Sequence, residues 1–353
     1  MQRQKLLLFL LLLLLSNCKD PYKLDVTRTV GRLVINGGIY DTPGPQFLKL
    51  GLTPEFNKDP DPLSGAYVSL QDENGNQESY HETGPGTYQL DGNIITGRPN
   101  GIYTLSIQLP DGRKYRSTPE KMPGTKATDS AYFKIVTETV VKPEGIPVDN
   151  TNVKIYLNSV LPSERSPSFI RWGVDEVYVI IPTCPPQALA CPPFCYIYQT
   201  ITKFDLKVIS TNDYQKPFIN DLLLQTRSVD YTFMVRHYFN VTQYTMNQNA
   251  FDYWQKVALI TERTGSIFDT PPANVPGNIV NINDPTEIVY GYFEASGTKL
   301  NRVKIDRGYM PSNVEVGTCQ FNFVYWPAGS PYNYCLNPYA IPGATTVMPD
   351  WFW

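Results

Sequence analysis

Between residue 31 and about residue 122, short segments alternate apolar and polar positions with the period of two that is typical of half-buried strands. We expect strands at 32–36, 46–52, 66–70, 86–90, 102–107 and 113–115. Asn74-Gly75 and Asp111-Gly112 mark hairpin turns, because both central residues of a type I′ turn need a positive φ. The pattern predicts a β-sandwich domain over residues 31–122.

Strand-like segments continue through the rest of the chain, which we expect to form a larger β-rich domain over residues 127–353. They cover residues 132–136, 153–157, 177–181, 231–238, 288–293 and 302–305. Residues 247–263 instead have apolar side chains at helical spacing. We expect one amphipathic helix there, packing Phe251 and Trp254 on a sheet and starting with a capping box of Thr245 and Gln248.

The N-terminus has the pattern of an export signal. A basic segment, residues 1–5, precedes an unbroken apolar run from Leu6 to Leu15, too short for a membrane span of about 20 residues. Leu15-Ser16-Asn17-Cys18 then resembles a bacterial lipobox. We therefore expect a signal peptide over 1–17, a lipidated Cys18 that anchors the protein to a membrane, and a tether over 18–30.

Composition excludes several function classes. Charged residues make up 18% of the 353-residue chain and no long run of Lys or Arg is present, so we expect no nucleic-acid partner. With only two histidines and none of the common catalytic or nucleotide-binding motifs, we expect no catalytic residue, no metal site and no cofactor. We expect His81 to be exposed and His237 to be a satisfied histidine within a strand. Residues 72–76 mimic the start of a calcium loop, but a hairpin turn is favoured there.

Five cysteines remain after lipidation, and an envelope compartment favours disulfides. The candidates are Cys184, Cys191, Cys195, Cys319 and Cys335. We expect one link within residues 184–195 and one that involves Cys335, although five cysteines leave fifteen ways to form two disulfides. The alternative is a soft-metal site, such as one for Cu(I), built from the three cysteines of the loop.

Aromatic residues make up 13% of the chain, and 24 of them are tyrosines. Sheet packing explains most of them, but exposed Tyr and Trp side chains also form binding platforms for sugars or proteins. The candidates near the cysteine loops are Tyr196, Tyr198, Trp326, Tyr332 and Tyr334.

Two resemblances extend these predictions. The order of turns and strands from Ser64-Gly65-Ala66 to Asp111-Gly112 resembles prealbumin-like, carboxypeptidase-regulatory-like sandwiches, which are interaction or spacer modules. The larger resemblance rests on Ala250-Phe251-Asp252-Tyr253-Trp254, Gly265-Ser266-Ile267-Phe268-Asp269, Pro276-Gly277-Asn278-Ile279, Asp284-Pro285-Thr286-Glu287, Gly291-Tyr292-Phe293-Glu294-Ala295-Ser296 and Pro349-Asp350-Trp351-Phe352-Trp353. On these residues the chain resembles domain-of-unknown-function family 4249, outer-membrane lipoproteins of Bacteroidota encoded beside TonB-dependent receptors.

The second resemblance implies a lipoprotein partner of an import system and assigns no catalytic residue. Lys19-Asp20 resembles the surface-export signal of that phylum, which favours the cell exterior over the periplasm, and Asp129-Ser130-Ala131 resembles its O-glycosylation acceptor, with Ser130 as the modified residue. We therefore expect a non-enzymatic accessory protein that binds or helps gate a small-molecule or peptide ligand for a TonB-dependent receptor. The alternatives are an envelope hydrolase with a site assembled by the fold, and a structural or adhesive surface module.

Overall fold

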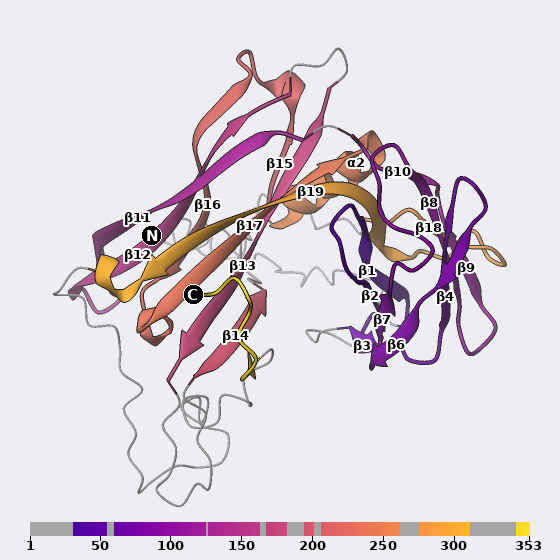
Figure 1. Cartoon of the computed structure of the whole chain (residues 1–353), viewed down its shortest axis with the longest axis horizontal. Coiled ribbons are helices and arrows are strands. Elements are labelled where there is room, and N and C mark those ends of the chain that lie inside the picture. The colour runs from indigo at the N-terminus through magenta and orange to yellow at the C-terminus, as the bar shows by residue number, and fades with distance from the viewer. Residues whose placement is uncertain are drawn as a thin grey trace, which may run out of the picture.

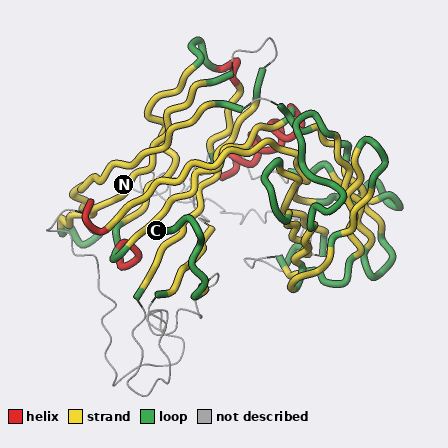
Figure 2. The backbone as a smooth tube through the Cα atoms, viewed as in Figure 1, coloured by secondary structure: helices red, strands yellow, loops and turns green. Residues whose placement is uncertain are grey.

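The computed structural model describes residues 31–54, 60–124, 126–162, 167–181, 194–200, 206–261, 275–310 and 344–353. Within these residues the protein is mainly β, as the sequence predicts, and Figure 2 shows strands in most of the chain. One α-helix is present in this part, α2 (Gln248–Thr261), together with short 3₁₀ turns at Thr211–Asp213, Tyr231–Phe233 and Arg307–Tyr309. The strands form two sandwiches that lie side by side (Figure 1).

The N-terminal sandwich has two layers around one hydrophobic core. One layer contains β1 (Leu33–Tyr40), β2 (Gln46–Leu52), β3 (Asp61–Pro62), β6 (His81–Gly84) and β7 (Thr87–Leu90). The other contains β4 (Tyr67–Asp72), β5 (Gln77–Ser79), β8 (Ile102–Gln108), β9 (Lys114–Ser117), β10 (Glu120–Lys121) and β18 (Ile279–Asn281). Gly75 and Gly112 have φ angles of +86° and +90° in the β4–β5 and β8–β9 hairpins, which confirms both predicted turns.

The second sandwich pairs a three-stranded sheet with a longer one. The three-stranded sheet contains β11 (Thr128–Val141), β12 (Pro147–Val160) and β16 (Phe218–Ser228). The facing strands are β13 (Phe169–Ile180), β14 (Cys195–Thr200), β15 (Lys207–Ser210), β17 (Arg236–Met246) and β20 (Ala344–Thr345). Ile155, Trp172 and Phe239 are buried between the two layers. The predicted strand at 231–238 starts late, because residues 231–233 form a 3₁₀ turn.

A single strand, β19 (Tyr290–Asp306), joins the two sandwiches. Its first half pairs in parallel with β1, with Val34 opposite Tyr290, and its second half pairs antiparallel with β17, with Thr245 opposite Gly297. The sequence predicted two separate strands here, because the polar residues between Phe293 and Arg302 interrupt the apolar pattern. The backbone nevertheless continues as a strand because it has partners on both sides.

The core of the N-terminal sandwich is not built from residues 31–122 alone. β18, β19 and the residue before β19 add four buried side chains to it, those of Ile279, Val289, Phe293 and Ala295. β18 pairs with β9, and β19 pairs with β1. Residues far along the chain therefore complete the first sandwich.

Helix α2 packs on the sheet as expected, with Phe251 stacked on Phe169 at a centroid distance of 4.6 Å. The predicted capping box is wrong. Asn247 caps the helix, because its Oδ1 accepts a hydrogen bond of 2.9 Å from the Ala250 backbone N–H. The Thr245 hydroxyl instead donates to the Gly297 carbonyl. No helix in the described part of the chain has both the length and the apolar character of a membrane span.

Candidate functional site: a polar pocket between the sandwiches

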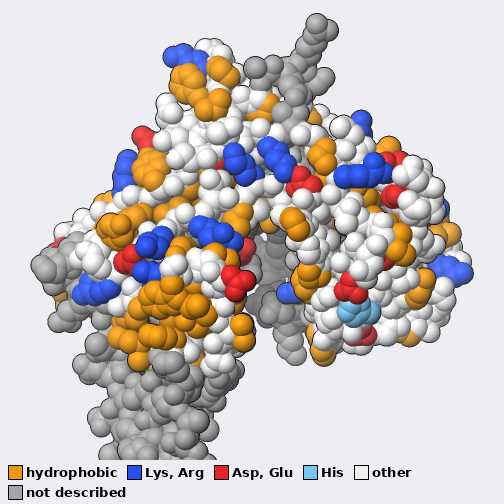
Figure 3. Space-filling view, in the orientation of Figure 1, with side chains coloured by type: hydrophobic (Ala, Val, Ile, Leu, Met, Phe, Trp, Pro, Cys, Tyr) orange, Lys and Arg blue, Asp and Glu red, His pale blue; other side chains and the backbone are white. Residues whose placement is uncertain are grey.

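A pocket of about 300 Å³ opens where β1, β13, β17, β19 and α2 meet. Figure 3 shows that the molecular surface is hollowed between the two sandwiches. The residues that line the pocket are Asn36, Gly37, Tyr40, Arg171, Gly173, Val174, Asp175, Tyr244, Trp254, Tyr292 and Glu294. Because β1 and β19 belong to the N-terminal sandwich while β13 and α2 lie on the second one, both sandwiches are needed to form the pocket.

A buried ion pair forms the inner wall of the pocket. A guanidinium nitrogen of Arg171 on β13 donates to Glu294 on β19, and the two residues are 8% and 1% exposed. The Glu294 carboxylate also accepts from Trp254 Nε1 at 2.8 Å and from the Tyr40 hydroxyl at 3.3 Å. These extra hydrogen bonds offset part of the cost of removing both charges from water.

Two aromatic rings enclose the Arg171 guanidinium. Its carbon lies 3.8 Å from the ring centroid of Tyr244 and 4.4 Å from that of Trp254. Burial lowers the pKa of Arg171, but the charge of Glu294, the nearby Tyr244 and Tyr40 and the hydrogen bond to Glu294 together raise it by more, so the net pKa is raised. Arg171 therefore remains a cation, and the flat faces of the two rings hold it through cation–π contacts.

Strand periodicity explains how these side chains come together. Arg171, Gly173 and Asp175 are two residues apart along β13, so they share one face of the sheet. The register places Arg171 directly opposite Tyr244 on β17. Gly173 carries no side chain between the two polar residues, which leaves room for the floor of the pocket.

The chemistry of the pocket favours binding over acid–base catalysis. Both oxygens of Glu294 already accept hydrogen bonds from Arg171, Tyr40 or Trp254. Burial and the charge of Glu294 raise the pKa of Tyr40 well above its ordinary value, so the phenol stays neutral at physiological pH. Both groups are therefore engaged in the hydrogen bonds of the pocket wall.

A second buried carboxylate, Glu120, fixes the surroundings of the pocket. It accepts hydrogen bonds of 2.9 Å from Thr118, Asn278 and Tyr292, and it also accepts from Asn247 at the start of α2. Burial, with the charge of Glu120, raises the pKa of Tyr292. This network ties β10, α2 and β19 together, and so it holds Trp254 and Glu294 in position.

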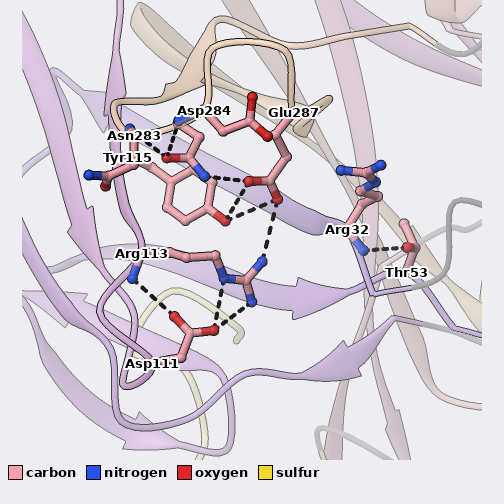
Figure 4. Close-up of polar contacts among 9 residues, drawn as sticks. Arg32, Thr53, Asp111, Arg113, Tyr115, Asn283, Asp284 and Glu287 are labelled. Atoms are coloured by element: carbon pink, nitrogen blue, oxygen red, sulfur yellow. Dashed lines mark hydrogen bonds and ion pairs between the residues drawn. The ribbon is translucent and has the colours of Figure 1, made fainter.

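A third polar network anchors the segment that leads into β19 (Figure 4). Arg113 lies between Asp111 and Glu287, and the Tyr115 hydroxyl donates to Glu287 at 3.1 Å. Burial, together with Glu287, raises the pKa of Tyr115 to about 12. Asn281 also donates to Glu287. Residues 281–287 are thereby fastened to the β8–β9 hairpin, which gives Glu287 of the Asp284-Pro285-Thr286-Glu287 motif a structural role.

Most cysteine candidates lie outside the described residues, namely Cys18, Cys184, Cys191, Cys319 and Cys335. Cys195, the first residue of β14, is a free thiol with no exposed surface. Burial raises its pKa. The structure thus contains no disulfide at Cys195, which packs instead among the apolar residues Tyr178, Ile180 and Ile197.

Among the aromatic candidates, Trp326, Tyr332 and Tyr334 also lie outside the described residues. Tyr196 is buried against Phe352, with ring centroids 5.0 Å apart, so it is not available as an exposed platform. Tyr198, two residues further along β14, is 43% exposed. Hydrophobic side chains gather on the surface near the C-terminal end of the chain (Figure 3), and the exposed apolar residues of this end are Val347, Met348 and Trp353.

The remaining candidates occupy strands of both sandwiches. Ser130 is exposed on β11, while the neighbouring Asp129 is buried and accepts hydrogen bonds from Trp172 and Gln243. His81 is exposed at the start of β6. His237 is fully buried with Nε2 3.3 Å from Glu176, although neither ring nitrogen forms a hydrogen bond within the described residues. None of these residues lines the pocket described above.

Sequence reasoning did not identify the pocket. Its strongest signal is a charged residue inside an otherwise apolar strand, as in Phe169-Ile170-Arg171-Trp172 and Tyr292-Phe293-Glu294-Ala295. Charged residues are almost never fully buried unless they are paired. Two such positions of opposite charge, Arg171 and Glu294, could have suggested a buried ion pair. The sequence does not show, however, that β13 and β19 come close enough for the two side chains to touch.

Comparisons with known proteins give little information on function. No curated protein matches the chain. The solved structures that resemble it include trypsin-activated alpha-2-macroglobulin from Escherichia coli (10% identity, TM-score 0.20), a DUF4785 family protein from Legionella pneumophila (6%, 0.18) and the adhesin InvE from Yersinia pseudotuberculosis (12%, 0.17). In the same order, these matches cover 63%, 60% and 60% of this chain. They cover 15%, 52% and 54% of the matched chains, so this chain spans less than two thirds of the length of each matched protein. TM-scores this low do not establish a common fold.

One comparison is decisive for classification. The family model of the domain of unknown function DUF4249 matches residues 19–302, which is most of the chain. The matched region contains every residue that lines the pocket, together with α2. It also contains most of the segments on which the sequence resemblance rests. The chain belongs to the DUF4249 family.

Proposed function

We propose that this protein is a non-enzymatic, lipid-anchored accessory protein of the outer membrane that captures a small ligand in the pocket between its sandwiches for a TonB-dependent transporter. The pocket is the observation that carries the binding role, because its opposite charges are already paired and its walls are aromatic. Small-molecule sites are commonly concave and aromatic-lined, with a few placed polar groups.

The membrane location rests on the sequence. The basic segment, the apolar run and Cys18 occur in the order and spacing of a lipoprotein signal. Lys19-Asp20 supports an orientation toward the cell exterior. A lipid at Cys18, followed by a tether up to residue 30, would leave both sandwiches free to reach a receptor in the same membrane.

A fold-assembled hydrolase is the second candidate, because the pocket does place two titratable groups, Tyr40 and Glu294, 3.3 Å apart. Their pairing argues against it, since Glu294 is held by Arg171 and Trp254 and the pKa of Tyr40 is raised. Acid–base catalysis by this pair would require one of the two groups to exchange a proton. A hydrolytic activity that is abolished by Tyr40→Phe, with folding intact, would favour the enzyme.

Affinity capture tests the transporter role. The native lipidated protein is purified from detergent-solubilised outer membranes, and the bound proteins are identified by mass spectrometry. Recovery of a β-barrel receptor supports the proposal, and the reciprocal capture on that receptor serves as the control. Repeated recovery with no receptor would contradict it. Unchanged growth of a deletion strain on every nutrient tested would favour a purely structural or adhesive module.

A further inference from the structure

We infer that the pocket between the sandwiches binds a neutral, hydroxyl-rich ligand of the sugar class, one ring at a time. This inference rests on the proposed binding function and names its ligand. The argument comes from the charge, the size and the walls of the pocket.

The charge of the pocket disfavours an anionic ligand. Arg171 and Glu294 neutralise each other. Among the described residues that line the pocket there is no second Lys or Arg. A carboxylate or phosphate would therefore find no cation in this lining that is not already paired, whereas a neutral ligand needs none.

The volume matches a single ring. A space of about 300 Å³ holds about ten water molecules, each occupying about 30 Å³ in the liquid. A hexose ring with its hydroxyl groups has a similar number of heavy atoms. The lining includes the exposed residue Asn36, so the pocket reaches the solvent and the rest of a longer chain could extend outward.

The walls combine flat apolar faces with planar hydrogen-bonding groups. Tyr40, Tyr244 and Trp254 supply aromatic surface for the C–H face of a sugar ring. The exposed side chain of Asn36 can hydrogen-bond to hydroxyls. In addition, Arg171 Nε is buried without a partner among the described residues, and a ligand oxygen that reached it would remove the cost of that unpaired donor.

The same geometry argues against an extended peptide. Peptides that bind to sheets usually add a strand to a free edge. The strands at this pocket have no such edge: β1 pairs with β2 and β19, β13 with β14 and β17, and β17 with β13 and β19. A ligand here must be recognised by side chains.

The inference can be tested by tryptophan fluorescence and calorimetry on the full chain purified in detergent. The probes are neutral gluco-, manno-, xylo-, galacto- and N-acetylglucosamine oligosaccharides, with uronic-acid oligosaccharides and short peptides for comparison. We expect one neutral series to bind saturably. Asn36→Ala and Trp254→Phe should each weaken it about fivefold to tenfold, which corresponds to the loss of one hydrogen bond or aromatic contact.

Trp353→Phe is the matched control, because Trp353 is exposed at the other end of the sheet and should not affect binding. Asn36 is an exposed residue of β1, so its replacement keeps the test informative if Trp254→Phe fails to fold. Binding of only the acidic sugars or the peptides, binding unaffected by both pocket variants, or no binding across the panel would overturn the inference. If affinity capture recovers a receptor but no sugar binds, only the assignment of the ligand as a sugar is contradicted. If a sugar binds but no receptor is recovered, only the transporter role is contradicted.

Discussion

At Arg171 and Glu294 the protein holds two opposite charges almost completely out of water. Such pairs contribute little net stability compared with apolar residues of similar volume, because desolvation offsets their attraction. Here each charge has additional partners, with Trp254 and Tyr40 on the carboxylate and two ring faces on the guanidinium. Their arrangement at a pocket wall therefore supports the ligand binding that we propose.

Removing only the negative charge should be costly. In Glu294→Gln the Arg171 cation stays buried without a counter-charge, and we expect the free energy of unfolding to fall by about 3 kcal/mol. Urea denaturation followed by circular dichroism measures this free energy. The control is Asp306→Asn, since Asp306 pairs with Arg236 and Lys304 but its side chain is 30% exposed. We expect a loss under about 1 kcal/mol there, and equal losses in the two variants would contradict the prediction.

The thiol of Cys195 should be inaccessible in the native protein. It has no exposed surface, and burial raises its pKa, so the reactive thiolate is disfavoured. We expect maleimide, added without reductant, to label Cys195 only after unfolding in urea, as located by peptide mass spectrometry. Labelling that requires prior reduction would show that Cys195 is in a disulfide, as the sequence had suggested.

At the scale of elements, β19 depends on close contact with β1. Gly291 has a φ of +83°, and a methyl group at its Cα would overlap the Ile35 carbonyl oxygen on β1. Gly277 likewise leaves no space for a side chain beside the Gly291 carbonyl. These two glycines, both in segments on which the family resemblance rests, let the strand lie where it can deliver Glu294 to the pocket.

Gly291→Ala should therefore destabilise the protein by about 3 kcal/mol, through the strained φ and the overlap with β1. Gly308→Ala is the matched control. The backbone of Gly308 is outside the positive-φ region, and no atom lies within 4 Å of the position that a Cβ would take. Thermal and urea unfolding of the two variants give the comparison. Wild-type stability of Gly291→Ala would mean that β1 and β19 are not this close.

The elements that the sequence predicted are those with local signals. Asn74-Gly75 and Asp111-Gly112 define hairpins through their own φ preferences, and helix α2 follows from apolar spacing over 14 residues. The cap at Asn247 was missed although its hydrogen bond from Ala250 is local, whereas the contact of Asn247 with the distant Glu120 cannot be seen in the sequence. The middle of β19 and the pocket were missed because they depend on pairing between segments far apart in the sequence.

For the whole molecule, the shared strand means that the N-terminal sandwich needs residues from the end of the chain. Residues 31–124 alone lack Ile279, Val289, Phe293 and Ala295, which complete their core. We expect this fragment to show no cooperative unfolding by near-ultraviolet circular dichroism of its buried Tyr103 and Tyr115. The same fragment with residues 275–306 attached through a flexible linker should regain cooperative unfolding. Cooperative unfolding of the short fragment would contradict the prediction.

The pairing of β1 with β19 also constrains how the protein would fold during the export that we propose. β1 comes from the beginning of the described chain, and its parallel partner comes from near the end, with Val34 opposite Tyr290. A chain that crosses a membrane starting from its N-terminus presents β1 long before β19 arrives. During that interval one edge of β1 has no partner, and an unpaired edge invites aggregation. Folding of the first sandwich must therefore wait for almost the entire chain, and under the proposed export to the outer membrane a periplasmic holding chaperone would protect it meanwhile.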